Sequence, residues 1–293
     1  MPIDPKLLDV TLPPSGYPEE VSREDTRENL MSAVSESGGV ITDFPNSMWI
    51  ERKDWGEVSR YLKETRTRAV DYLDRFTHQG NSHECTCHAL RACMESARNR
   101  ARRISLGPPE AGKRLEISAK SASVWLSPLS VYAEANPRQW GGAGVRQVLR
   151  IAVKRGMLPD PIQPRPWKFK HKLHSTIGPT SINQTGGGWA SLRNFPEGWQ
   201  ETAKHFKPVE FIFPETWEQS VCLVLNSLML GVGRDGHSIP YGEWIDDEEV
   251  MAYPDSYDLV RYDSVRRIKA TVGDSYAVVS VKTPDDWEKP AGE

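Results

Sequence analysis

The segment at residues 79–90, QGNSHECTCHAL, constrains the fold of this chain more than any other part of the sequence. Residues 86–103 contain no Gly or Pro and carry apolar side chains at helical spacing, which predicts a largely buried helix that begins just after Cys85. The positive end of a helix dipole favours an ionised thiol, and only the thiolate is nucleophilic. Cys85 therefore stands where a reactive cysteine is expected.

A second feature of this segment is Gln79, which lies six residues before Cys85 and precedes a Gly that favours a turn. Such a turn lets the side-chain amide of Gln79 point toward the thiol. Together with the backbone N–H of Cys85, the amide would form an oxyanion hole, which stabilises the charge that develops on an attacked carbonyl. The segment thus predicts a centre for acyl transfer.

These residues resemble the papain superfamily of cysteine hydrolases, in particular its bacterial and phage branch with the pattern Q-G-x-x-G-S-C-T-A-x-A-hydrophobic. The matching positions are Gln79, Gly80, Cys85, Thr86, Ala89 and Leu90. Cys87 is the alternative nucleophile, but it lies eight rather than six residues after Gln79. Where the family has Gly-Ser before its cysteine, this chain has His83-Glu84, and a nearby carboxylate disfavours a thiolate.

Two later segments extend the resemblance. Residues 125–136, WLSPLSVYAEAN, are similar to the second helix of the family. Residues 140–160 are similar to the family's segment with a paired glycine that lines the substrate cleft. The resemblance implies that Gly141 and Gly142 contact the substrate backbone, and the alternative is that they only open a helix.

Residues 236–245, GHSIPYGEWI, resemble the family's Gly-His strand, which carries the catalytic histidine. The resemblance implies that His237 pairs with Cys85 as an imidazolium and later protonates the leaving group. A histidine at the start of a strand is otherwise a structural residue. The Gly before His237 and the apolar run that precedes it favour the catalytic interpretation.

The family orients its histidine with an Asn in the motif N-S-W-G, and the resemblance assigns this role to Asp263 in VRYDSVRR. This segment has no Trp after Ser264, so the match is incomplete. Asp258 and Tyr262 are the alternatives, because a slip of one residue in strand register reverses the face that a strand presents. Residues 273–281, GDSYAVVSV, resemble the closing strand of the family.

The order of the predicted elements indicates an α+β fold, because helices come first and strands last. Helices are predicted in the segments 22–37, 55–66, 86–103, 126–137 and 141–160, and strands in 208–214, 220–233, 237–245, 257–263 and 276–282. We expect an N-terminal extension at 1–70, a helical half at 71–200 with the Cys85 helix, and a β-rich half at 201–293 with His237. A papain-like fold implies a cleft between the two halves that holds the active site.

Composition excludes several classes of protein. A net charge of −3 provides no general attraction to nucleic acid, and the longest apolar stretches fall short of the roughly 18 residues of a membrane span. Four cysteines are too few for a disulfide scaffold and indicate a reducing compartment, either cytoplasm or the inside of a virion. The first 20 residues lack the cationic and apolar regions of a signal peptide, so we expect none.

A metal site is the rival interpretation of the cysteine segment, since His83, Cys85, Cys87 and His88 form an H-x-C-x-C-H cluster. Structural zinc sites bring ligand pairs from separated positions, and four ligands within six residues, partly on a helix, do not easily surround one ion. We therefore expect neither a metal nor another cofactor.

The resemblance implies a cysteine hydrolase that acts on a polypeptide through a thioester on Cys85. Amidase and transglutaminase-like chemistry use the same residues. The alternative from a different class is a papain-like fold that cleaves nothing and serves as a structural or assembly component, such as a protein of a phage particle. The His83-Glu84 substitution, the missing Trp and the long extension favour this alternative, whereas Gln79, Cys85 and His237 favour the enzyme.

Overall fold

The computed structural model describes the chain over residues 27–73, 79, 83–105, 125–135, 142–159, 198–234, 236–246, 249–256, 259–265, 269 and 272–283. Within these residues it contains helices and two sheets, one mixed and one antiparallel. The predicted α+β class is therefore confirmed. In this part of the chain, no helix combines the length and the apolar character that crossing a membrane requires.

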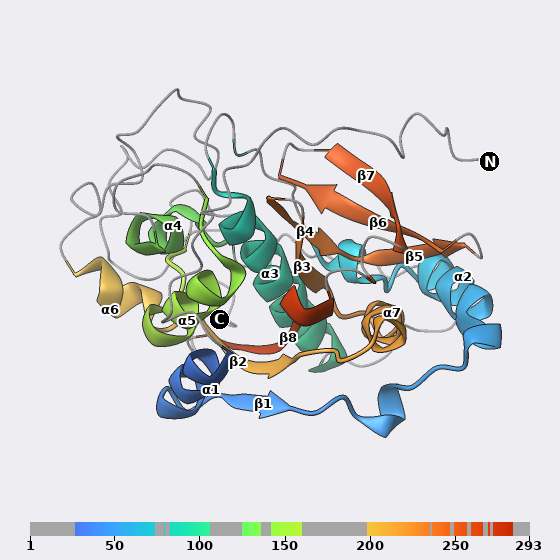
Figure 1. Ribbon diagram of the computed structural model, residues 1–293, viewed down its shortest axis with the longest axis horizontal. Helices are drawn as coiled ribbons and strands as arrows, with labels where there is room; N and C mark the ends of the chain where they lie inside the picture. Colours follow the sequence, from blue (N-terminus) through green and yellow to red (C-terminus); the bar gives the residue numbers. More distant parts are fainter. Residues whose placement is uncertain are drawn as a thin grey trace, which may run out of the picture.

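Helix α3 (Cys85–Ser105) is the central element of the helical half and agrees closely with the predicted helix at 86–103. Every residue from 85 to 98 is buried. Figure 1 shows α4 (Leu129–Ala135), α5 (Val145–Arg155) and α6 (Trp199–Ala203) on one side of α3 and the strands β3 to β7 on the other. A helix enclosed in this way needs apolar or paired side chains on all its faces.

The β-rich half contains two sheets. The larger has the strand order β1-β2-β8-β3-β4, and its strands are β1 (Val40–Thr42), β2 (Lys207–Ile212), β8 (Ser275–Lys282), β3 (Leu230–Arg234) and β4 (His237–Tyr241). The smaller has the order β5-β6-β7, with β5 (Glu243–Asp246), β6 (Val250–Asp255) and β7 (Leu259–Ser264). Only the β1–β2 pair is parallel among the pairs of the described strands.

The five-stranded sheet has a hydrophobic core on each face. Along β8, Tyr276 and Val278 pack in the core that contains α3 and α5, whereas Ala277 and Val279 pack in a second core. Successive side chains of a strand point to opposite faces, so one apolar strand can serve both cores. The apolar run at 276–279 therefore explains why β8 lies in the interior of the sheet.

The N-terminal segment at 27–73 packs against both cores. It comprises α1 (Arg27–Glu36), β1, the 3-10 helices η2 (Asn46–Met48) and η3 (Arg52–Asp54), α2 (Trp55–Thr65) and η4 (Ala69–Tyr72). Leu30 and Val34 of α1 belong to the core around α3, and Trp55 belongs to the second core. From residue 27 onward, the predicted extension is thus built into the fold.

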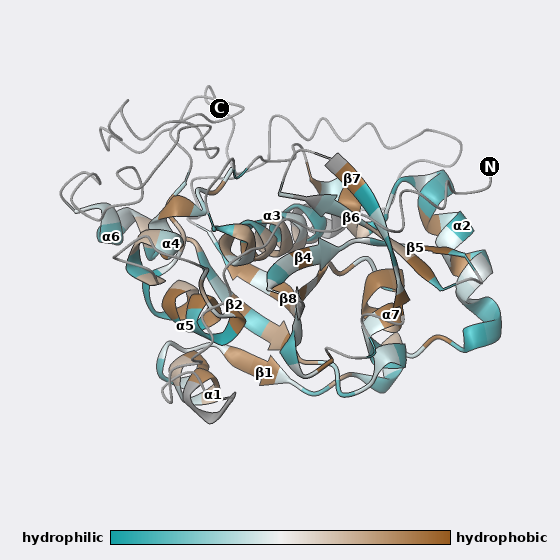
Figure 2. Ribbon diagram, turned by 45° about the horizontal axis from the view of Figure 1, so that its top comes forward, coloured by the Kyte–Doolittle hydropathy of each residue, from teal (hydrophilic) through white to brown (hydrophobic). Residues whose placement is uncertain are grey.

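One predicted strand is wrong. Residues 220–233 were expected to form a strand, but the structure has helix α7 (Trp217–Leu225) and then β3 from Leu230. The hydroxyl of Thr216 accepts a hydrogen bond from the backbone N–H of Gln219 at 3.2 Å and so caps the helix. Helix α7 is hydrophobic on nearly all sides and buried from residue 220 onward (Figure 2), and such a helix has the same apolar pattern as a buried strand.

Candidate active site

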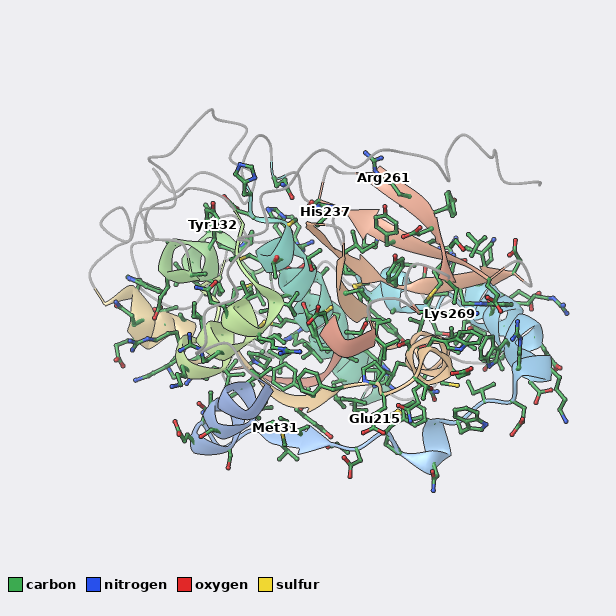
Figure 3. All side chains as sticks on the ribbon, viewed as in Figure 1. Met31, Tyr132, Glu215, His237, Arg261 and Lys269 are labelled. Carbon is green, nitrogen blue, oxygen red and sulfur yellow. The ribbon has the colours of Figure 1, made fainter. Side chains whose placement is uncertain are left out.

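Cys85 and His237 lie together where the two halves of the molecule meet. Cys85 is the first residue of α3, and His237 is the first residue of β4. His237 acts on the Cys85 sulfur, whose pKa its ring lowers by hydrogen bonding and by charge, and the two residues are 0% and 2% exposed, respectively. Figure 3 shows His237 near the N-terminal end of α3. The structure thus brings together the predicted nucleophile and the predicted base.

The surroundings of Cys85 favour its thiolate. Burial raises the pKa of this thiol, but the hydrogen bond and the charge of His237 lower it by more, with help from the backbone of Ser238 and the hydroxyl of Thr86. The pKa of Cys85 therefore lies below its ordinary value. For Cys87, by contrast, burial and then the charges of Glu84 and Cys85 raise the pKa well above that value. This contrast favours Cys85 over Cys87 as the nucleophile.

Gln79 is held in a buried position by one residue of the β-rich half. Its backbone N–H donates to the carbonyl oxygen of Ser256 at 2.6 Å, and the hydroxyl of Ser256 donates to Oε1 of Gln79. Because Ser256 occupies the amide oxygen, the amide group has a fixed orientation. Gly80, the predicted turn residue, lies outside the described residues.

The glycine segment lies beside the first turn of α3. The hydroxyl of Thr86 donates to the carbonyl oxygen of Ala143 at 2.8 Å, and the Thr86 oxygen is 3.9 Å from the Cys85 sulfur. Ala143 directly follows Gly142, so this bond ties the chain at Gly142 to the residue next to the nucleophile. Gly141 lies outside the described residues. Substrate contact by either glycine stays a prediction.

Asp263 occupies a different place from the one predicted. Its Oδ2 accepts a hydrogen bond from the hydroxyl of Tyr241 at 2.5 Å, and its Oδ1 accepts one from the backbone N–H of Ser264 at 2.9 Å. Asp263 of β7 is opposite Met251 of β6, and Met251 is opposite Trp244 of β5. Trp244 lies seven residues after His237 in the chain.

The prediction for Asp263 assumed that the strand at 257–263 pairs with the strand of His237, and this pairing is corrected by the structure. Strand β7 pairs with β6 within the smaller sheet, and β6 is the strand that lies against β4. Asp263 is therefore at the Tyr241 end of β4. The alternative residue Asp258 lies outside the described residues, and Tyr262 is opposite Ala252 on the same outer strand.

The end of β6 takes the position that was predicted for β7. The backbone N–H of Gly242 donates to the carbonyl oxygen of Ala252 at 3.0 Å, and the rings of Tyr241 and Tyr253 are 5.4 Å apart. In an antiparallel arrangement, each step back along β4 matches a step forward along β6. Beyond Tyr253, β6 therefore runs toward the His237 end of β4, and Ser256, which holds Gln79, directly follows its last residue.

Sequence reasoning missed this end of β6. Asp255-Ser256-Tyr257 has an acidic residue, a serine and an aromatic residue in the order of the family motif N-S-W, whereas Asp263 and Ser264 precede a valine. The aromatic residue was the signal that could have identified it. Within the described residues, no group of three or more His, Cys, Asp or Glu side chains is arranged to hold a metal ion.

Comparison with known proteins gave matches among solved structures alone. No protein-family model and no curated protein matches the sequence. Xylellain, a cysteine protease from Xylella fastidiosa, has 14% identity and a TM-score of 0.47, and the match covers 72% of this chain and 83% of that one. The clostridial cysteine protease Cwp84 after propeptide cleavage has 10% identity and a TM-score of 0.48, covering 74% of this chain and 57% of that one.

A third similar structure is proCathepsin B S9 from Trypanosoma congolense, with 9% identity and a TM-score of 0.41, covering 77% of this chain and 76% of that one. Two of these three structures are named as cysteine proteases and the third as a proCathepsin B.

Proposed function

We propose that this chain is a papain-like cysteine peptidase, with Cys85 as the nucleophile and His237 as its base and acid. The observation that carries the proposal is the action of His237 on Cys85, the first residue of α3, which holds the pKa of the thiol below its ordinary value. The helix pole and the imidazolium both stabilise a thiolate, the form in which a cysteine attacks carbonyl carbon.

The residues of the site account for each step of peptide hydrolysis. The Cys85 thiolate attacks the carbonyl carbon, and the electron pair of the C=O bond moves to oxygen. The backbone N–H of Cys85 and the amide of Gln79 stabilise this oxyanion. When the C–N bond breaks, His237 gives its proton to the leaving amine. His237 then removes a proton from water, which attacks the thioester, and the acid product leaves as the thiol pair is restored.

Asp255 is the residue that we assign to the orientation of His237, in place of Asp263. The support is positional: Asp255 is the last residue of β6, it precedes the serine that holds Gln79, and β6 runs toward the His237 end of β4. An imidazolium formed against a thiolate needs an acceptor at its outer N–H, and a carboxylate or an amide can provide one.

A polypeptide substrate is favoured by the backbone that surrounds the nucleophile. The bond from Thr86 to Ala143 keeps the Gly142 segment beside Cys85. Exposed peptide groups of a glycine segment can pair with the backbone of an extended substrate without a side chain in the way.

The reactivity of Cys85 tests the proposal directly. Iodoacetamide should alkylate Cys85 at a lower pH than an ordinary thiol, because its pKa is lowered, and the rate should fall as the pH falls through that lowered pKa. Cys93 and Cys222 should react only at higher pH, since burial raises both of their pKa values. Mass spectrometry of the labelled peptides measures all three rates in one sample.

Activity is measured on the same protein with a quenched-fluorescent peptide library. Cleavage that is lost in both Cys85→Ala and His237→Ala supports a peptidase. Transfer of the acyl group to an added amine, without hydrolysis, would indicate transglutaminase-like chemistry instead. Uniform labelling of the cysteines near pH 8.5, with no cleavage, would contradict the proposal and favour the inert assembly component.

A further inference from the structure

Glu84 and His88 form a buried pair on the first turn of α3. The backbone N–H of His88 donates to the carbonyl oxygen of Glu84 at 3.0 Å, which makes Glu84 the capping residue directly before the helix. The Oε2 atom of Glu84 is 3.6 Å from Nε2 of His88, and the two side chains are 1% and 2% exposed, respectively. Neither side chain takes part in the steps proposed above.

The position of Glu84 is unfavourable for a nucleophile. A carboxylate that directly precedes Cys85 is close to the helix pole that stabilises the thiolate, and like charges disfavour each other in a buried site. The reach of this charge is visible in its neighbours: the Glu84 charge adds to burial in raising the pKa of Cys87 and of Tyr132. An uncompensated carboxylate here would work against catalysis.

We propose that Glu84 and His88 are a charge-balancing pair, in which protonated His88 offsets the Glu84 carboxylate and thereby permits the Cys85 thiolate beside it. His88 is thus a positioning residue for the charge of the site, and it acts through Glu84 rather than on the substrate. The consequence for catalysis rests on the proposed function, but the effect on the thiol does not.

The next charged groups along α3 are arranged in the same way. One turn beyond His88, Arg91 and Glu95 form a buried ion pair with an N–O distance of 2.6 Å. On the side of β4, His237 balances Cys85. Cys87 of α3 and Tyr132 of α4 face the pair as neutral groups, because their pKa values are raised. Acidic and basic side chains therefore lie in successive pairs along the first turns of α3.

The test is the pH midpoint of Cys85 alkylation in the full chain. His88→Gln removes the cation that faces the carboxylate, so the midpoint should rise by about one pH unit. The double variant E84Q/H88Q also removes the carboxylate, so its midpoint should return to that of the unchanged protein. Glu84→Gln alone should not raise the midpoint. If the pair had only a structural role, the second substitution would not bring the midpoint back.

Two controls make the result decisive. His83→Gln changes a half-buried histidine two residues before the start of α3 and should leave the midpoint unchanged. Circular dichroism confirms that each variant is folded. Equal midpoints in H88Q and the unchanged protein, or an equal rise in H88Q and the double variant, would overturn the proposal.

The readout separates this inference from the proposed function. Loss of peptide cleavage in the unchanged protein, with the midpoints shifted as expected, would contradict the peptidase and leave the charge-balancing pair standing. Peptide cleavage with unshifted midpoints would support the peptidase and contradict the charge-balancing pair.

Discussion

Four cysteines of the same chemical type have different properties in this chain because their surroundings differ. Cys85 has an imidazole and two further hydrogen-bond donors at its sulfur, which together outweigh the effect of burial on its pKa. Cys93 has the Tyr276 hydroxyl beside it and Cys222 has the backbone of Ile50, but burial dominates in both. Of the four cysteines, only Cys85 therefore has a pKa below its ordinary value.

The assignment of Asp255 gives a prediction at this scale. Asp255→Ala should lower kcat about 100-fold with a smaller change in KM, because a misoriented imidazole matters most in the transition state. Asp255→Asn should keep much of the activity, since an amide oxygen can accept the same bond. Steady-state kinetics on a cleaved peptide measure both effects.

Asp263→Ala is the matched comparison. It removes the acceptor of the Tyr241 hydroxyl, so it should destabilise the protein by about 1–3 kcal/mol while kcat changes little. If Asp263→Ala instead abolishes turnover in a folded protein and Asp255→Ala does not, the original prediction from the sequence was right.

At the scale of elements, helix α2 shows how the N-terminal segment is joined to the rest of the protein. The indole of Trp55 is 2% exposed and makes edge contacts with Trp217 and Trp244, with ring centroids 5.6 and 5.9 Å apart. Its N–H donates to the carbonyl oxygen of Ile50 at 2.9 Å. Residues from 27 to 73 thus contribute to the core, as an integral part of the domain would.

Trp55→Ala should therefore lower the free energy of unfolding by about 3–5 kcal/mol, because it removes a large buried aromatic side chain. Tyr61 on the same helix is 62% exposed, and Tyr61→Ala should change stability by less than about 0.5 kcal/mol. Urea denaturation of the two variants gives both values. Similar small effects in both would mean that α2 is loosely attached.

At the scale of the whole molecule, distant parts of the sequence meet where α5 ends. Gly156 has φ of +85°, and a Cβ built on it would lie 1.8 Å from the carbonyl oxygen of Ala203 at the end of α6. The next residue, Met157, donates its backbone N–H to the carbonyl oxygen of Phe206 at 2.9 Å. At this point the end of α5 contacts the segment that leads into β2. Only glycine, which has no Cβ, allows the two backbones to lie so close together.

Gly156→Ala should destabilise the protein by about 2–4 kcal/mol, because the new methyl group strains the backbone and separates these segments. The control is Gly144→Ala at the start of the same helix, where φ is −66° and nothing lies within 4 Å of a built Cβ. That variant should cost less than about 1 kcal/mol. Thermal unfolding of the pair measures the difference; equal melting temperatures would refute the close approach.

Much of the fold was predictable because its signals are local. Helix α3 was predicted at 86–103 from the absence of Gly and Pro, and strand β8 was predicted at 276–282 from its apolar run; both agree with the structure within two residues. Such patterns depend on residues close in the chain, so the sequence determined them. The pairing of Cys85 with His237 joins two distant segments and was predicted only from their resemblance to the papain superfamily.

The tertiary structure decided what depends on pairing between distant segments. No local pattern determines whether residues 220–225 form a helix or a strand. Nor does one determine whether β4 lies against β6 or β7. The pairing of β7 with β6 placed Asp263 on the outer strand of the smaller sheet, and the first turn of α3 placed His88 beside Glu84. The physical reason is that strand pairing is stabilised by contacts along the whole sheet, which no single strand specifies.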